Sequence, residues 1–196
     1  MKLCVFQGTF NPIHKVHLEV ANFAKEFYHF DKILFIPAYK PPHKTVDKSL
    51  ALHRFNMVKL AISDIKGFQI SDIEYKKERN SYTYFTILEL KKKYNIQDRI
   101  NFLIGTDAFS KIDTWYETDK LKELVHFIIF QRSDNFKKSD FEKFKTLGYD
   151  FEFSPMDFID VSSTKLRNNL QLGKSINNLE IPKVREYIKK YGLYQK

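Results

Sequence analysis

Two histidines three residues apart stand where a short apolar run gives way to a helical pattern. His14 and His17 follow residues 6–12, which read Phe-Gln-Gly-Thr-Phe-Asn-Pro. At this spacing both imidazoles project from about the same side of a helix. A neutral ring can donate an N–H to a phosphate oxygen, and a protonated ring adds positive charge. Free backbone N–H groups and the helix dipole favour an anion at the same point, so residues 6–18 predict an anion site.

Other chemistries fit this segment less well. A zinc site needs further ligands, and no Cys/His cluster of the sequence supplies them. Two ordinary surface histidines are a second alternative, which the preceding Gly-Thr-Phe-Asn-Pro turn disfavours. The sequence contains neither a Gly-x-x-x-x-Gly-Lys-[Ser/Thr] loop nor a Gly-x-Gly-x-x-Gly segment. These absences argue against a P-loop phosphotransferase and against the usual dinucleotide-binding fingerprint.

The composition indicates a folded chain with anionic partners. The 196 residues are 43% hydrophobic and 29% charged, which is typical of a globular domain. The net charge of +9 favours nucleotides or nucleic acid. The lysines lie in separate predicted helices among acidic or apolar residues, which favours solvated helix faces over a nucleic-acid stripe. We therefore expect no nucleic-acid partner.

Cysteine use and hydropathy bear on the compartment. Cys4 is the single cysteine, so no intrachain disulfide can form, as is typical of a reducing cytosol. The first apolar run is too short for the core of a signal peptide, and no run approaches the length of a membrane span. We expect a cytoplasmic protein with no membrane partner.

The elements that must position the histidines alternate between strands and helices. Short runs that are apolar on both faces predict buried parallel strands at Leu3–Phe6, Ile33–Pro37, Phe68–Ser71, Ile100–Ile104, Phe127–Gln131 and Phe151–Phe153. Helical patterns and their start and stop signals predict helices at Val16–Phe27, Ser49–Ile62, Thr83–Tyr94, Thr118–Leu124, Ser162–Leu172 and Pro182–Tyr191.

This alternation predicts an α/β fold, a single doubly wound, mostly parallel sheet with helices on both faces. We expect one domain over residues 1–196, with a helical C-terminal portion, about 162–196, packed on it. In such a fold the ligand crevice lies at the carboxyl ends of the strands.

Several polar side chains fall near that crevice. Ser162 opens a predicted helix, where its hydroxyl either faces an anion or is a plain N-cap. Arg167 lies one turn further on and can fork two phosphate oxygens. Lys44, in a Pro-containing loop, is either a mobile point charge or an ordinary exposed lysine. Asp107 ends a predicted strand, either as a ligand-binding residue or as the N-cap of a short helix.

Aromatic residues near the same edge can hold a planar ring. Trp115, the single tryptophan, follows a predicted strand and is either a stacking surface or an anchor of the core or of a lid. Tyr82 and Thr83 open a predicted helix, whose free N–H groups can receive a carboxylate.

Residues 8–17 resemble the loop of the nucleotidylyltransferase family, which is written Gly-x-Phe-x-Pro-x-His-x-Gly-His. Over essentially the full length, the order and spacing of further segments resemble the bacterial nicotinate-nucleotide adenylyltransferases. Each segment is weak alone, and together they are specific: Pro41-Pro42-His43-Lys44, Asn80-Ser81-Tyr82-Thr83, Gly105-Thr106-Asp107, Thr114-Trp115-Tyr116-Glu117, Val161-Ser162-Ser163-Thr164-Lys165-Leu166-Arg167 and Tyr191-Gly192-Leu193-Tyr194.

The resemblance implies transfer of AMP from ATP to nicotinate mononucleotide, with deamido-NAD and pyrophosphate as products. It implies catalytic roles for His14, His17 and Arg167. It implies ATP binding by Gly8, Thr9, Phe10, Gly105, Asp107, Ser162 and Thr164, and mononucleotide binding by Lys44, Tyr82, Thr83, Trp115 and Tyr116. Mg²⁺ is expected to come with ATP rather than to occupy a protein metal site. A homo-oligomer is compatible with the resemblance.

The chain departs from the family pattern at three positions. Gln7 and Val16 stand where glycine is usual, and Asn169 stands where a basic residue is frequent. A β-branched side chain at position 16 predicts a tighter or shifted adenine pocket. Gln7 either donates a hydrogen bond to phosphate or crowds the loop.

Two alternatives remain open at this level. One keeps the chemistry and changes the acceptor to nicotinamide mononucleotide or to another phosphorylated acceptor such as pantetheine phosphate. His14 argues against pantetheine phosphate, because enzymes that use it usually lack the first histidine. The other alternative is a non-catalytic nucleotide- or RNA-binding domain, which the net charge and the altered loop allow.

Overall fold

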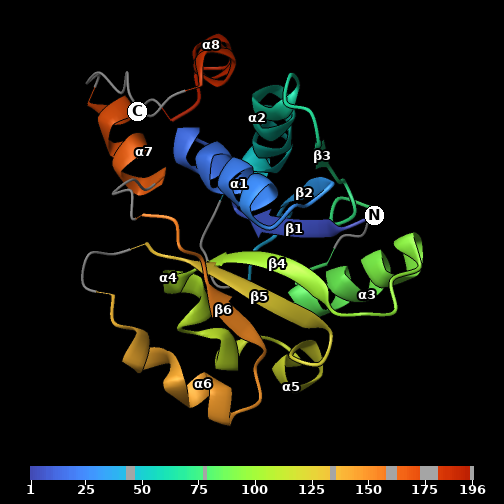
Figure 1. The fold of residues 1–196 in the computed structure, drawn as a ribbon. Helices are drawn as coiled ribbons and strands as arrows, with labels where there is room; N and C mark the ends of the chain where they lie inside the picture. The colour runs from blue at the N-terminus through green and yellow to red at the C-terminus, as the bar shows by residue number, and fades with distance from the viewer. Residues whose placement is uncertain (43–46, 77–78, 133–135, 158–162, 173–180, 195–196) are drawn as a thin grey trace.

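A six-stranded sheet, parallel throughout, forms the centre of the molecule (Figure 1). The computed structural model describes residues 1–42, 47–76, 79–132, 136–157, 163–172 and 181–194. The strand order is β3-β2-β1-β4-β5-β6. The strands are β1 Leu3–Gly8, β2 Lys32–Pro37, β3 Phe68–Ile70, β4 Ile100–Gly105, β5 Val125–Phe130 and β6 Phe151–Phe153. This architecture confirms the predicted fold class.

The order of the strands in the sheet determines where a ligand can lie. β1 pairs with β2 over its whole length, from Leu3 opposite Lys32 to Gly8 opposite Pro37. On its other side β1 pairs with β4, so the strand order reverses direction between these two strands. Loops leaving β1 and β4 therefore diverge to opposite faces of the sheet, and a crevice opens between them.

The helices occupy the predicted segments with small shifts at their ends. They are α1 Lys15–Phe27, α2 Ala51–Ile62, α3 Thr83–Tyr94, α4 Thr106–Phe109, α5 Thr118–Leu121, α6 Glu142–Thr146, α7 Ser163–Gln171 and α8 Pro182–Lys190. Three short 3₁₀ helices are η1 Lys48–Leu50, η2 Ile112–Thr114 and η3 Lys138–Phe141. The sequence did not predict α6, η2 or η3, because elements of three to five residues carry too little periodicity. A short helix was considered after Asp107, but α4 starts one residue earlier with Gly105 as its N-cap, so Asp107 lies in its first turn.

One boundary was wrong by several residues. The helix expected over Thr118–Leu124 ends at Leu121, and a turn follows in which Leu124 donates its N–H to the carbonyl of Leu121 at 2.9 Å. The chain then enters β5 at Val125, two residues earlier than predicted, because Val125 pairs with Ile100 of β4.

Helices cover both faces of the sheet (Figure 1). One face packs its apolar residues against α1, α2 and α8, whose buried members include Val20, Met57 and Ile188. The other face packs against α3 to α6, with Ile87 and Phe109 among the buried residues. This double coverage explains why the predicted strands read as continuous apolar runs.

The C-terminal helix joins the first of these two cores. α8 begins with Pro182 at its first position and ends before Gly192, which has a φ of +58°. Its Tyr187 hydroxyl accepts a hydrogen bond from Asn56 of α2 at 3.1 Å and lies 3.0 Å from the His53 ring. No helix in the described part of the chain is long and apolar enough to span a bilayer.

Phe127 provides a test of the core on the α3–α6 face. It is fully buried in β5, and its ring lies 5.3 Å from that of Phe109. We expect Phe127→Ala to lower the free energy of unfolding by about 3–5 kcal/mol, measured by urea titration. The matched variant Phe27→Ala, at a position 53% exposed, should lose less than about 1 kcal/mol. Equal losses would contradict the assignment of Phe127 to the core.

Candidate active site

A cleft of about 890 Å³ lies at the carboxyl ends of β1, β4 and β5. Nearly all of the predicted site residues that the structure describes line it: Gly8, Thr9, Phe10, His17, Tyr82, Thr83, Gly105, Asp107, Trp115, Tyr116, Thr164 and Arg167. Residues separated by more than 150 positions thus share one cavity. The predicted site residues Lys44 and Ser162 lie outside the described residues.

The loop after β1 takes its shape from the core beneath it. Phe10 has a φ of +46° and is only 3% exposed, and its ring contacts those of Phe6 and Phe35. A β-carbon added at Gly8 would lie 3.0 Å from the Phe10 ring. Phe10 therefore mainly anchors this loop in the core, and it also forms part of the cleft wall.

At the start of α1 the ring of His17 bonds to the backbone of His14, and the His17 N–H donates to the His14 carbonyl at 3.0 Å. The His14 backbone N–H donates to Nδ1 of His17 at 3.2 Å, and the two ring centroids are 3.7 Å apart. Accepting this bond at Nδ1 places the proton of a neutral His17 on Nε2. His17 lines the cleft, so this arrangement aims a histidine donor at the anion position.

His14 lies beneath the cleft surface rather than on it. Its side chain is fully buried, and neither ring nitrogen has a hydrogen-bond partner among the described residues. Desolvation, with a smaller contribution from the charge of Arg132, lowers the pKa of His14 to about 3. His14 is therefore neutral at physiological pH, which argues against the positive charge predicted for a protonated ring at this position.

Helix α7 meets the same loop from the opposite side. Arg167 donates to the carbonyl oxygen of Asn11 at 2.7 Å and to the hydroxyl of Thr164 at 3.2 Å. The hydroxyl of Tyr194, near the C-terminus, donates to Oδ1 of Asn11 at 2.6 Å. Ser163 donates to the carbonyl of Pro12 at 3.1 Å. These bonds hold the Arg167 guanidinium and the loop between β1 and α1 together at one wall of the cleft.

Aromatic side chains form the other end of the cleft. The rings of Tyr82 and Tyr116 stack at 4.5 Å with an interplanar angle of 27°. Trp115 packs partly against the core and also lines the cleft beside them, where its ring can be reached by a ligand. Thr83 is the first residue of α3. The N–H groups of Phe85 and Thr86 donate to the Tyr82 carbonyl, whereas those of Thr83 and Tyr84 have no acceptor within the helix. This end of the cleft suits a planar ring that carries an anionic substituent.

Two cationic residues of the cleft, Lys111 and Arg132, belong to none of the motifs in the sequence. Arg132 follows β5 by two residues, and its backbone N–H donates to the Thr106 hydroxyl at 3.0 Å. A β-carbon at Gly105 would lie 2.6 Å from the Arg132 side chain and 2.6 Å from the Asp107 carboxylate. Position at the carboxyl end of a predicted strand was the signal that could have identified Arg132.

Another missed residue, Arg54 of α2, is fully buried below the cleft. Its guanidinium donates to the carbonyl oxygens of Thr9 at 2.8 Å, Ala38 at 2.6 Å and Tyr39 at 3.0 Å. Burial lowers the pKa of Arg54 from its ordinary value, but an arginine remains charged in proteins. One cation therefore joins the loop after β1 to the loop after β2.

The three departures from the family pattern lie in different surroundings. Gln7 lines the cleft, but its amide nitrogen donates to Oε1 of the buried Glu74, so in this structure the amide is directed into the protein. Val16 is 6% exposed and belongs to the core on the α1 face, outside the residues that line the cleft. Asn169 is half-buried on α7.

Carboxylates are scarce in the cleft. Asp107 is the one acidic side chain among the described residues that line it. No group of three or more His, Cys, Asp or Glu side chains suited to a metal ion occurs within the described residues. A single carboxylate fits a divalent cation held mainly by phosphate oxygens.

Comparison with known proteins agrees with this geometry. The profile of the cytidylyltransferase-like family matches residues 5–169. A protein of Caldicellulosiruptor bescii named "Probable nicotinate-nucleotide adenylyltransferase" is 39% identical over 100% of both chains. A protein of Clostridium tetani with the same name is 40% identical over 99% of each chain.

A solved structure shows the same fold. The Plasmodium falciparum nicotinic acid mononucleotide adenylyltransferase, in complex with NaAD, superimposes with a TM-score of 0.81 at 24% identity. The match covers 98% of this chain and 96% of that one. The full-length identity to the bacterial proteins and the family profile together show that this chain belongs to the cytidylyltransferase-like family and, within it, to the nicotinate-nucleotide adenylyltransferases.

Proposed function

We propose that this chain transfers AMP from ATP to nicotinate mononucleotide, yielding deamido-NAD and pyrophosphate in NAD biosynthesis. One observation carries the proposal: the cleft that holds His17 and Arg167 also bears the aromatic wall of Tyr82, Trp115 and Tyr116. The first end suits phosphate oxygens, and the second suits a pyridine ring. The names of its bacterial relatives support this choice of substrates.

The reaction is an in-line displacement at the α-phosphorus of ATP. A phosphate oxygen of the mononucleotide forms a bond to that phosphorus while the bond to the bridging oxygen of pyrophosphate breaks. The attacking phosphate is already ionised at neutral pH, so no general base is required. Catalysis then depends on alignment and on neutralising negative charge.

Side chains around the cleft supply that neutralisation. His17 offers an N–H donor at the first turn of α1, and Arg167 offers a planar guanidinium on α7. Lys111 and Arg132 add positive charge on the walls near β4 and β5. Both substrates are anions, so these cations reduce the repulsion between them.

We further propose that Mg²⁺ enters bound to ATP, with Asp107 as the carboxylate available to it. When bound, the ion neutralises charge on the phosphates.

The single cysteine, which is buried, and the dispersed lysines support a cytoplasmic enzyme without a nucleic-acid partner. A homo-oligomer is compatible with this proposal, and analytical ultracentrifugation measures the oligomeric state.

Pyrophosphate release from ATP tests the acceptor. We expect release with nicotinate mononucleotide and at least about tenfold less with nicotinamide mononucleotide or pantetheine phosphate, since the helix α3 N-terminus favours a carboxylate. Faster release with another acceptor would contradict the assignment of nicotinate mononucleotide as the substrate. Absence of release with every acceptor would favour a non-catalytic nucleotide-binding domain.

Replacing His17 tests the phosphate end of the cleft. We expect His17→Ala to lower kcat by at least about tenfold, which corresponds to about 1.4 kcal/mol of transition-state stabilisation. The control is His29→Asn, an exposed histidine with a φ of +55°, a backbone conformation that asparagine tolerates. Unchanged steady-state kinetics in His17→Ala would exclude a role in binding the phosphates.

Replacing Trp115 tests the aromatic end of the cleft. We expect Trp115→Ala to raise KM for the mononucleotide about fivefold or more, because a stacking surface worth roughly 1 kcal/mol is lost. KM for ATP should change by less than about twofold, and Trp115→Phe should retain most of the affinity. An equal rise in both KM values would contradict this assignment.

A further inference from the structure

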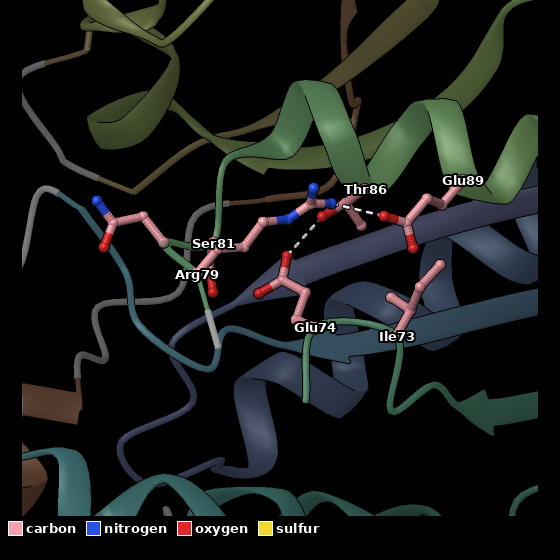
Figure 2. A pocket seen from close by; sticks show the side chains of 7 residues that line it. Ile73, Glu74, Arg79, Ser81, Thr86 and Glu89 are labelled. Carbon is pink, nitrogen blue, oxygen red and sulfur yellow. Dashed lines mark hydrogen bonds and ion pairs between the residues drawn. The ribbon is translucent and has the colours of Figure 1, made fainter. Parts of the chain in front are cut away.

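A buried carboxylate outside the assigned site residues lies below the cleft. Glu74 is 8% exposed and stands in the segment between β3 and α3. Figure 2 shows its side chain directed at Thr86 of α3, whose hydroxyl donates to Oε1 of Glu74 at 2.8 Å. The backbone N–H of Tyr39 donates to Oε2 at 3.2 Å, and the Gln7 amide donates to Oε1. Ser81 contributes a further hydrogen bond.

These donors come from three segments that build the cleft. Gln7 precedes Gly8 at the end of β1, the phosphate side of the cleft. Tyr39 follows β2 and leads to the prolines of the cleft wall. Thr86 lies one turn into α3, which begins beside Tyr82 on the aromatic side. A single carboxylate thus connects the segments that form the two ends of the cleft.

A second set of bonds holds the segment after β2 in the same position. The Tyr39 residue is bound on both sides, because its N–H donates to Glu74 and its carbonyl accepts from Arg54 at 3.0 Å. Lys40 and Ser81 exchange two hydrogen bonds: the Lys40 N–H donates to the Ser81 hydroxyl at 3.0 Å, and the Ser81 N–H donates to the Lys40 carbonyl at 2.9 Å.

Glu74 faces several donors at once. Burial is the largest influence and raises the pKa of Glu74, and the bonds from Ser81, Thr86, Tyr39 and Gln7 lessen that rise. An ionised carboxylate accepts at about four positions, whereas a carboxamide or a carboxylic acid gives up acceptor capacity to an N–H or O–H donor. Replacing the carboxylate by an amide therefore leaves at least one of these donors without an acceptor.

We infer that Glu74 is a positioning residue that sets the spacing between the ATP-binding and mononucleotide-binding segments through Gln7, Tyr39 and Thr86. This role rests on the proposed adenylyl transfer. Gln7 stands where the family pattern usually has glycine, and its bond to Glu74 holds the added side chain in one orientation at the edge of the phosphate site.

The test compares Glu74→Gln with two variants that each remove one partner. We expect Glu74→Gln to lower kcat/KM about tenfold or more for both substrates. Thr86→Val, which keeps the side-chain shape, should lower kcat/KM about threefold for the mononucleotide and less for ATP. Gln7→Gly should lower it about threefold for ATP and less for the mononucleotide.

Non-additivity identifies the connection between Gln7 and Glu74. The kcat/KM of the double variant Gln7→Gly/Glu74→Gln should stay within about twofold of that of Glu74→Gln alone. The reason is that Glu74→Gln already removes the carboxylate to which the Gln7 amide donates. Glu123→Gln is the matched control, an exposed carboxylate that pairs with Arg99, and it should stay within twofold of wild type.

Two outcomes would overturn the inference. In the first, Glu74→Gln lowers Tm and leaves both kcat/KM values within twofold of wild type, which is the result of a purely structural role. In the second, the Gln7 and Glu74 effects simply add. If Glu74→Gln does not fold, the opposite substrate effects of Thr86→Val and Gln7→Gly still decide, and equal effects on both substrates would overturn the inference.

Failure of the proposed function gives a different result. In that case the wild-type chain releases no pyrophosphate with nicotinate mononucleotide. ATP affinity, measured by calorimetry, then tests the position of the phosphate loop without turnover. We expect Glu74→Gln to weaken ATP binding at least about fivefold, and unchanged affinity would overturn the inference in that case too.

Discussion

A single buried cation holds the substrate-binding loops in place. Arg54 lies in α2 with no exposed surface, and its guanidinium binds the carbonyls of Thr9, Ala38 and Tyr39. A buried charge is costly unless its donors are satisfied, so these carbonyls must stay where Arg54 can reach them. The loops after β1 and β2 are therefore constrained together before any nucleotide binds. Glu74 adds the start of α3 to the same network.

The parallel sheet determines what those loops can reach. Because β1 and β4 are neighbours and their loops leave to opposite faces, the two substrates can meet between them. The phosphate end takes its donors from α1, α7 and the loop after β5, whereas the aromatic end takes its rings from the residue before α3 and the segment after η2. Such a cleft suits a reaction that needs alignment of two anions and charge neutralisation more than it needs an acid or a base.

Burial changes the chemistry of side chains that the sequence presents as equivalent. His14 and His17 share one motif, yet His14 is enclosed and neutral, while His17 lines the cleft with its Nδ1 occupied by the His14 N–H. Gln7 could have turned toward phosphate, but it donates instead to a carboxylate from a distant segment. In both cases desolvation and the available partners decide the role, and neither quantity can be read from spacing along the chain.

The sequence alone determined the fold class, the six strands, the longer helices and many of the polar and aromatic residues that line the cleft. Apolar periodicity reports burial directly, and short motifs lie at strand ends, where parallel sheets bind ligands. It did not find Arg54, Glu74, Lys111 or Arg132, nor the separation of His14 from His17. These residues depend on contacts between segments far apart in the sequence, such as Gln7 with Glu74 and Thr9 with Arg54. A lone Arg in a helix or Glu in a turn reads as a surface residue, and only tertiary packing can remove it from water and give it partners.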